Sequence, residues 1–235
     1  MADFFQKYRS VIVLVLILTT VAVTKRVNED VMLEVFGPKP KVLATVVLDA
    51  GHGGMDPGKV GVAGTLEKEL NLEFVYRIKR LLEQNNVHVV LTRESDAGLY
   101  TEADSNKKSA DMRKRIEIIE KEAPALVVSI HQNSYTSPSC KGAQVFYYEG
   151  SETGKALAEL LQSVIKETLA DGNTREAKAN GSYYMLKKSA YTSVIVECGF
   201  LSNPEEEALL LTEEYQEKMA WAIHLGILQY LNNED

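Results

Sequence analysis

Short apolar runs rich in β-branched residues recur along the chain, each bounded by glycine, proline or polar residues. Such runs are typical of buried β-strands. They alternate with longer stretches in which apolar side chains recur every three or four residues, which is the spacing of an amphipathic helix. Because strands and helices alternate, the pattern predicts a layered α/β domain with mostly parallel strand pairing.

The predicted strands lie at the start of Thr45–Gly54 and in Val87–Thr92, Ala125–His131, Ala143–Tyr148, Tyr183–Leu186 and Ser193–Glu197. The predicted helices cover Leu66–Asn85, Lys107–Glu120, the region from Leu157 to Ile165, a segment opened by Asn203-Pro204, and a last segment from Tyr215 to Ile223. The polar stretch Arg93–Asn106 is predicted to be a long loop.

Three of the predicted strands end in polar side chains. The first meets Asp49 and breaks at a glycine-rich turn that holds His52, while the other two end in His131 and Glu197. Burying a polar group at the end of a strand costs free energy unless the group has a hydrogen-bonding or charged partner. Since open α/β sheets bind ligands at the carboxyl ends of their strands, these residues point to one shared site.

The N-terminal residues form a separate region. Lys7 and Arg9 precede an apolar run from Val11 to Val23, which is shorter than the roughly 20 residues of a spanning helix and fits a secretory segment better. Residues 1–24 are therefore predicted to be a signal peptide or an N-terminal membrane anchor, with a buried first helix as the alternative. Residues 25–42 read as a linker, and residues 43–233 as the catalytic domain. This organisation predicts an extracytoplasmic protein.

Charge and cysteine content narrow the classes of partner. The chain has 235 residues and a net charge of −7; the first 24 residues carry +1, so the remainder carries −8. An acidic domain is a poor candidate for binding nucleic acid, and contact with a membrane is expected only through the N-terminal segment. Cys140 and Cys198 are too few for a disulfide scaffold, although they could pair in an oxidising compartment.

The candidate residues indicate a function more clearly as a set than singly. Alone, His52 is a loop hydrogen-bonding residue, Glu67 favours the N-terminal end of its helix, and His88 and His224 are structural. Together, two imidazoles and a carboxylate, His52, His131 and Glu67, form a donor set that catalytic Zn²⁺ uses. Zinc held this way lowers the pKa of a water from 15.7 to about 7. Glu197 is then free to move a proton to a leaving nitrogen, and Asp49 to orient His52.

A phosphate-binding loop is the rival interpretation of the same turn. Gly53–Lys59 has the spacing G-x-x-x-x-G-K after a strand. The next residue is Val60, where that motif needs serine or threonine, and Pro57 removes one backbone amide from the cradle. The sequence therefore favours the metal site.

Four ordered motifs resemble those of the zinc-dependent N-acetylmuramoyl-L-alanine amidases, the family-3 cell-wall amidases. They are LDAGHGGMDPG, TLEKELNL, SIHQNS and VECGFLSN, and the likeness runs from about Val46 to Leu231. The resemblance implies a three-layer α/β sandwich with a mixed, mostly parallel sheet of about six strands between helices. By motif position it implies that His52, Glu67 and His131 are zinc ligands and that Glu197 is catalytic, with peptidoglycan as substrate.

Further segments resemble the amidases of sporulation and germination, which act on spore-cortex peptidoglycan in forming muramic δ-lactam. They are TRESD, GAQVFYY and NTREAKANGSYYMLKK. Longer family members sometimes carry a blocking helix between the third and fourth motifs. Here that interval is predicted to hold only a strand, a helix and a short strand, so we expect an open site and control through a regulatory protein partner, zinc loading or timing of expression.

Several alternatives stay open at this level. A vegetative cell-wall amidase, a wall-binding module that kept the fold without catalysis, and a zinc peptidase that cuts within the stem peptide would share much of the pattern. Arg93 and Arg115 sit where the family commonly has arginine; they could anchor a substrate carboxylate or buttress the loop.

Overall fold

The computed structural model describes residues 6, 8, 11, 13–26 and 42–233. The chain divides into two compact units, Met1–Lys41 and Val42–Asp235. In the first unit residues 13–26 are helical with exposed side chains. Among the described residues, no helix combines the length and apolar character that crossing a bilayer requires. Most of the predicted linker lies outside the described residues, and the signal or anchor role of residues 1–24 stays a prediction.

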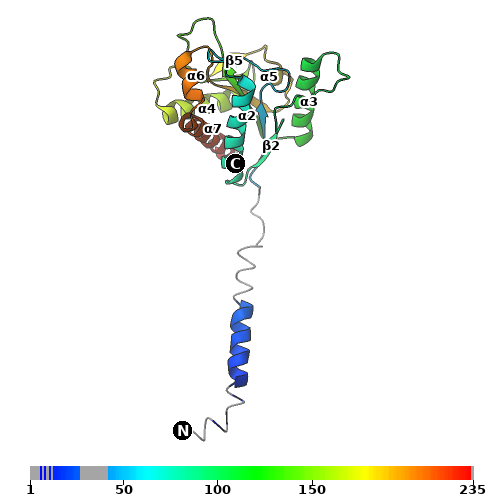
Figure 1. Cartoon of the computed structure of the whole chain (residues 1–235), viewed down its shortest axis with the longest axis vertical. Helices are drawn as coiled ribbons and strands as arrows, with labels where there is room; N and C mark the ends of the chain where they lie inside the picture. The colour runs from blue at the N-terminus through cyan, green and yellow to red at the C-terminus, as the bar shows by residue number, and fades with distance from the viewer. Residues whose placement is uncertain (1–5, 7, 9–10, 12, 27–41, 234–235) are drawn as a thin grey trace. The chain divides into compact units, whose positions relative to one another are not determined.

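The second unit is built on one six-stranded sheet with the order β2-β1-β3-β6-β4-β5. Figure 1 labels the two edge strands of this sheet, β2 and β5. Every pair of neighbouring strands is parallel except β4 and β6, which are antiparallel. The mixed, mostly parallel sheet of six strands is therefore confirmed. The strands are β1 (Thr45–Ala50), β2 (His88–Leu91), β3 (Leu126–Asn133), β4 (Gln144–Tyr148), β5 (Lys178–Asn180) and β6 (Thr192–Phe200).

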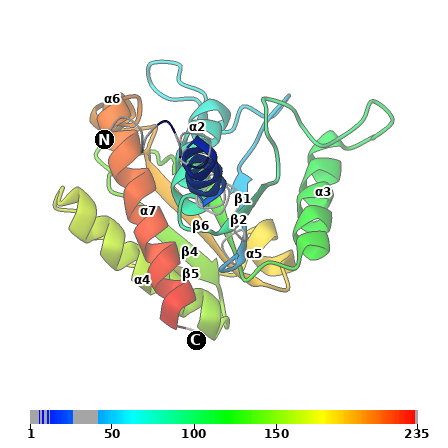
Figure 2. The ribbon, with the colours of Figure 1, turned by 90° about the horizontal axis from the view of Figure 1, so that it is seen from below.

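Helices cover both faces of this sheet, which gives the predicted three layers. On one face α2, α4 and α7 pack against the side chains of Leu48, Val128 and Val196, and α4 and α7 lie side by side (Figure 2). On the other face α3 and α5 pack against Val47 and Val127. The helices are α2 (Glu67–Glu83), α3 (Lys107–Glu122), α4 (Glu152–Leu169), α5 (Tyr184–Lys188), α6 (Pro204–Leu210) and α7 (Glu213–Asn233).

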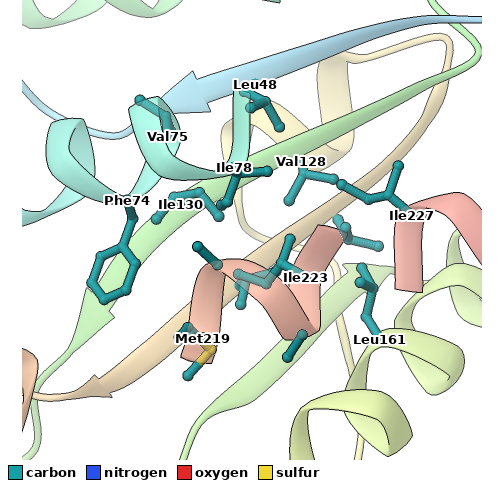
Figure 3. Packing of buried hydrophobic residues seen from close by; sticks show 14 of the residues in the cluster. Leu48, Phe74, Val75, Ile78, Val128, Ile130, Leu161, Met219, Ile223 and Ile227 are labelled. Carbon is teal, nitrogen blue, oxygen red and sulfur yellow. The ribbon is translucent and has the colours of Figure 1, made fainter. Parts of the chain in front are cut away.

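The central strands are apolar on both sides because both of their faces are covered. Successive residues of β1 point to opposite faces, so Leu48 joins the larger cluster and Val47 the smaller one. The larger cluster includes Leu161 of α4, Ile223 of α7 and Val128 of β3 (Figure 3). This double burial holds the strand ends that carry the site in fixed positions.

The predicted strand over Tyr183–Leu186 is wrong. Residues Tyr184–Lys188 form the short helix α5, in which Met185 packs in a cluster with Ile116 and Leu186 in a cluster with Ile195. A short apolar run does not distinguish a strand from a buried turn of helix. The strand in this region is instead the polar edge strand β5, which pairs with β4.

The two cysteines do not form a disulfide. Cys198 is buried within β6, Cys140 is partly exposed after β3, and both are free thiols. The pairing left open by the sequence is thus absent from the described domain, and the core is held by apolar packing.

Leu161→Ala tests this packing. Because the Leu161 side chain is wholly buried between α4, α7 and the sheet, we expect the free energy of unfolding to fall by about 2–5 kcal/mol. Urea denaturation followed by circular dichroism measures the change. The exposed Leu211→Ala is the control, expected to stay within about 0.5 kcal/mol of wild type; an equal loss in both variants would contradict the assigned core.

Candidate active site

The residues predicted to carry chemistry converge at one edge of the sheet. His52 follows β1, His131 lies near the end of β3, and Glu197 lies in β6 directly opposite His131 in the strand register. Glu67 is the first residue of α2 and is almost wholly buried. The carboxyl ends of three neighbouring strands and the beginning of one helix therefore surround a single point.

The turn after β1 is shaped to leave room for the imidazoles. His52 has a φ of +62° and is followed by two glycines that also have positive φ, so the chain reverses tightly. A Cβ at Gly51 would lie 2.2 Å from His131 Cε1, because the His131 ring occupies the space a side chain would need. Glycine at position 51 is thus required for His131 to enter the site.

Three side chains come together as a compact donor set. Glu67 Oε1 lies 3.2 Å from His52 Nε2 and 2.9 Å from His131 Nδ1. One ligand atom from each of the three residues lies within 4.8 Å of the others. Ligands about 2.0–2.2 Å from a tetrahedral Zn²⁺ are separated by about 3.3–3.6 Å, so this two-histidine, one-carboxylate set fits the ion.

The Glu67 carboxylate is held in its ionised form. Burial alone would raise its pKa, but the hydrogen bonds and charges of His131 and His52 outweigh burial and keep the pKa well below the usual range. Its oxygens also accept hydrogen bonds from the backbone amides of Gln132 at 3.1 Å and Lys59 at 2.7 Å. The anion that a metal ligand requires is therefore stable at this position.

Glu197 is in a different state. Its side chain is buried, and among the described residues its Oε2 has no hydrogen-bond partner. Burial, together with the negative charge of Glu67, raises the pKa of Glu197 to about 7, against the opposing effect of His131. A carboxyl group with a free oxygen and a pKa near neutrality can both accept and donate a proton.

Asp56 pairs with the His52 ring. Asp56 Oδ2 lies 3.0 Å from His52 Nδ1, so the other ring nitrogen faces Glu67, and Lys108 Nζ lies 3.2 Å from the same carboxylate oxygen. The hydrogen bonds of the Asp49 side chain go to Thr92, Ser129 and Arg115 instead. Any support that Asp49 gives to His52 is therefore indirect, through Arg115, which donates to the His52 carbonyl, and the orienting role of Asp49 stays a prediction. Asp56 lies within the first of the four motifs, but its contact with His52 follows from the geometry of the turn and not from its residue type.

The two arginines buttress the loop. Arg115 is buried; it pairs with Asp49 and Asp111 and donates to the carbonyl of His52 at 2.5 Å. Arg93 is also buried and donates only to backbone carbonyls, including that of Gly51 at 3.1 Å. Since four of the five N–H donors of each guanidinium are used within the fold, the contacts of both arginines are those of residues that support the loop.

The donor set and Glu197 line a cavity of about 600 Å³. Tyr100, Lys107 and Lys108 line it on one side, and Tyr183 and Met185 of the α5 region on another. Neither His88, which is exposed, nor His224, which is buried in α7, lines this cavity.

The phosphate-loop alternative fails on geometry. A phosphate-binding loop leads directly into a helix, but no helix begins at Lys59. Val60 and Leu66 form a β-bridge instead, and α2 begins at Glu67. The backbone amide of Lys59 is directed at the Glu67 carboxylate, so an anionic side chain occupies a donor that a phosphate cradle would need.

Comparison with known proteins identifies the family. The model of the N-acetylmuramoyl-L-alanine amidase family matches residues 46–229. The chain belongs to this amidase family. The germination-specific N-acetylmuramoyl-L-alanine amidase of Bacillus subtilis is 36% identical over 192 residues, which are 80% of this chain and 80% of that protein.

Solved structures of amidases share the fold. The CwlD amidase of Clostridioides difficile, solved in complex with the GerS lipoprotein, has a TM-score of 0.78 and 40% identity, and the match covers 81% of this amidase and 99% of that chain. The amidase AmiC2 of Nostoc punctiforme has a TM-score of 0.71 and 36% identity, covering 81% and 98% of the two chains.

Asp49→Asn tests the support beneath the His52 turn. Because the substitution removes one of the two carboxylates that neutralise buried Arg115, we expect the free energy of unfolding to fall by about 3–5 kcal/mol. Chemical denaturation of the purified amidase measures the loss. The control is Glu117→Gln, which breaks the exposed Lys114–Glu117 pair on α3, the helix that carries Arg115. It is expected to lower the free energy of unfolding by less than about 1 kcal/mol. Similar losses in both variants would show that burial does not govern the effect.

Proposed function

We propose that this amidase hydrolyses the amide bond between the lactyl group of N-acetylmuramic acid and L-alanine in peptidoglycan, with Zn²⁺ as its cofactor. Membership of the family supports the reaction. The observation that carries the cofactor is the close approach of His52, Glu67 and His131 around one point, with Glu67 kept ionised. These three residues would hold the ion.

The roles of the side chains follow from their environments. Zinc in such a site supplies a Lewis acid for the scissile carbonyl and favours deprotonation of water. Glu197 accepts the proton of the attacking water at its free Oε2 and delivers it to the departing nitrogen of L-alanine. Asp56 holds His52 in the tautomer whose Nε2 faces Glu67, and Gly51 leaves the space that His131 fills.

The biological setting is proposed from the relatives. Similarity to the germination-specific amidase and to CwlD supports a role in spore-cortex muramic δ-lactam formation, outside the cytoplasm. CwlD was solved with a lipoprotein, which supports a regulatory protein partner for this amidase as well. A vegetative cell-wall amidase is the second candidate, because another relative, from Staphylococcus epidermidis, carries the name "Probable cell wall amidase LytH".

His131→Ala tests the metal site. Removal of one of three protein ligands is expected to weaken zinc binding by more than about 100-fold, since loss of outer supporting contacts alone typically costs 10–100-fold. Isothermal titration calorimetry with Zn²⁺ and elemental analysis of the purified protein measure the change. His88→Ala removes an exposed imidazole from β2 and serves as the control. Zinc affinity that is equal in the two variants would refute the proposed ligand set.

Glu197→Gln tests the catalytic assignment. The amide keeps the shape of the side chain but removes the acid–base function, so release of stem peptides should fall by at least about 100-fold while zinc stays bound. Chromatography and mass spectrometry of digested muropeptides measure release; intact L-alanine amino termini and peptide-free muramic acid identify amidase cleavage and exclude cutting within the stem.

Two further arms complete this experiment. Exposed Glu159→Gln on α4 is the matched control and should retain wild-type release. Unchanged release in Glu197→Gln would overturn the role of Glu197, and no release by wild type would favour a non-catalytic wall-binding module. Parallel digests of spore-cortex and vegetative muropeptides, with and without a chelator, distinguish the two proposed settings.

A further inference from the structure

Two adjacent lysines border the cavity at the beginning of α3. Lys107 and Lys108 both line it, together with the metal-site residues and Glu197. No acidic residue lies in the first turn of α3, where negative charge would be favoured and two cations are electrostatically unfavourable. In an acidic protein, this placement calls for a negatively charged occupant in the cavity.

The ion pair that Lys107 makes is easily exchanged. Lys107 Nζ lies 2.9 Å from Glu102, whose side chain is 92% exposed, so the pair is weak and its partner can turn into solvent. Lys107 also lies 5.4 Å from the centre of the Tyr100 ring. Tyr100 is fixed in turn, because its hydroxyl accepts a hydrogen bond from the backbone amide of Met55 at 2.9 Å. The ammonium is thus held at the cavity without a strong partner.

Other cations of the cavity do not offer the same function. The guanidinium of Arg115 donates its hydrogen bonds to Asp49, Asp111 and backbone carbonyls. Lys59 also lines the cavity, and its backbone amide donates to Glu67 at 2.7 Å, which places this residue beside the donor set. Of the cavity's cations that the structure describes, this leaves Lys107 together with its neighbour Lys108, which also contacts Asp56 beside His52.

The geometry points to Lys107 and Lys108 as a subsite for a carboxylate on the peptide portion of the substrate, beyond L-alanine. This inference rests on the proposed function, which puts the scissile amide at the metal site and the acidic stem peptide in the rest of the cavity. Charge-assisted hydrogen bonds from ammonium groups to such a carboxylate select acidic peptides over amidated ones. The lysines therefore determine specificity, and the metal site performs the reaction.

The test uses two substrates that differ by one carboxylate. They are N-acetylmuramoyl-L-alanyl-D-glutamate and N-acetylmuramoyl-L-alanyl-D-isoglutamine, both blocked as methylamides at the γ-carboxyl. Wild type is expected to prefer the acid by about tenfold in kcat/KM, a difference of about 1.4 kcal/mol. Lys107→Gln/Lys108→Gln should abolish this preference, chiefly through the KM of the acid. Added salt should weaken it in wild type, because exposed charges are screened.

Controls separate the subsite from other effects. Lys114→Gln removes an exposed lysine from the same helix outside the cavity and should keep the wild-type preference. Since Lys108 contacts Asp56, which holds His52, zinc content is measured in every variant, and Lys107→Gln alone must reduce the preference with zinc content unchanged. An undiminished preference in the double variant would overturn the subsite.

A binding measurement distinguishes failure of the subsite from failure of the proposed function. Calorimetric titration with L-alanyl-D-glutamate and L-alanyl-D-isoglutamine, blocked in the same way, reports on the lysines without cleavage. Acid-selective binding that depends on Lys107, without cleavage of either substrate, would support the subsite and overturn the amidase assignment. Cleavage of both substrates at equal efficiency would support the amidase and overturn the subsite. Neither binding nor cleavage would overturn both.

Discussion

The buried carboxylate of Glu67 is the constraint on which the active site depends. It is an anion at the beginning of α2 that contacts side chains from the β1 turn and from β3, and backbone amides from two further positions. An unpaired charge at this depth would be strongly unfavourable, so the segments around it must supply donors or a cation. The fold and the donor set are thus parts of one electrostatic arrangement.

A second buried arrangement keeps the turn after β1 in place. Arg93 and Arg115 donate to the carbonyls of the residues from Ala50 to His52, which satisfies backbone acceptors that a tight turn cannot pair within itself. Asp49 neutralises Arg115 from the end of the strand. The position of the His52 ring is therefore set by contacts on its backbone as well as by Asp56 on its side chain.

Much of the fold and the main cluster could be predicted because the relevant signals are local. The apolar runs before Asp49, His131 and Glu197 mark strands, and parallel strands bring their carboxyl ends together. The antiparallel direction of β4 has no such signal, because the apolar sequence pattern of a buried strand does not indicate the direction in which the strand runs. Lys108 looks like an ordinary surface residue in the sequence, and although Asp56 lies within the first motif, only the turn geometry shows that it contacts His52.

The antiparallel pairing of β4 with β6 has a consequence for how this family can acquire control. Gln144, the first residue of β4, pairs with Glu197, so β4 runs away from the catalytic edge, and the chain returns through α4, β5 and α5 before β6. Among the described residues of this return path, those that line the cavity belong to the short α5 region. Lengthening a surface connection costs little free energy, because closure entropy grows only logarithmically with length. An inserted segment on this path could cover the cavity while β1, β3 and β6 keep their positions. Autoinhibition can therefore be gained or lost without a change in the sheet that carries the site.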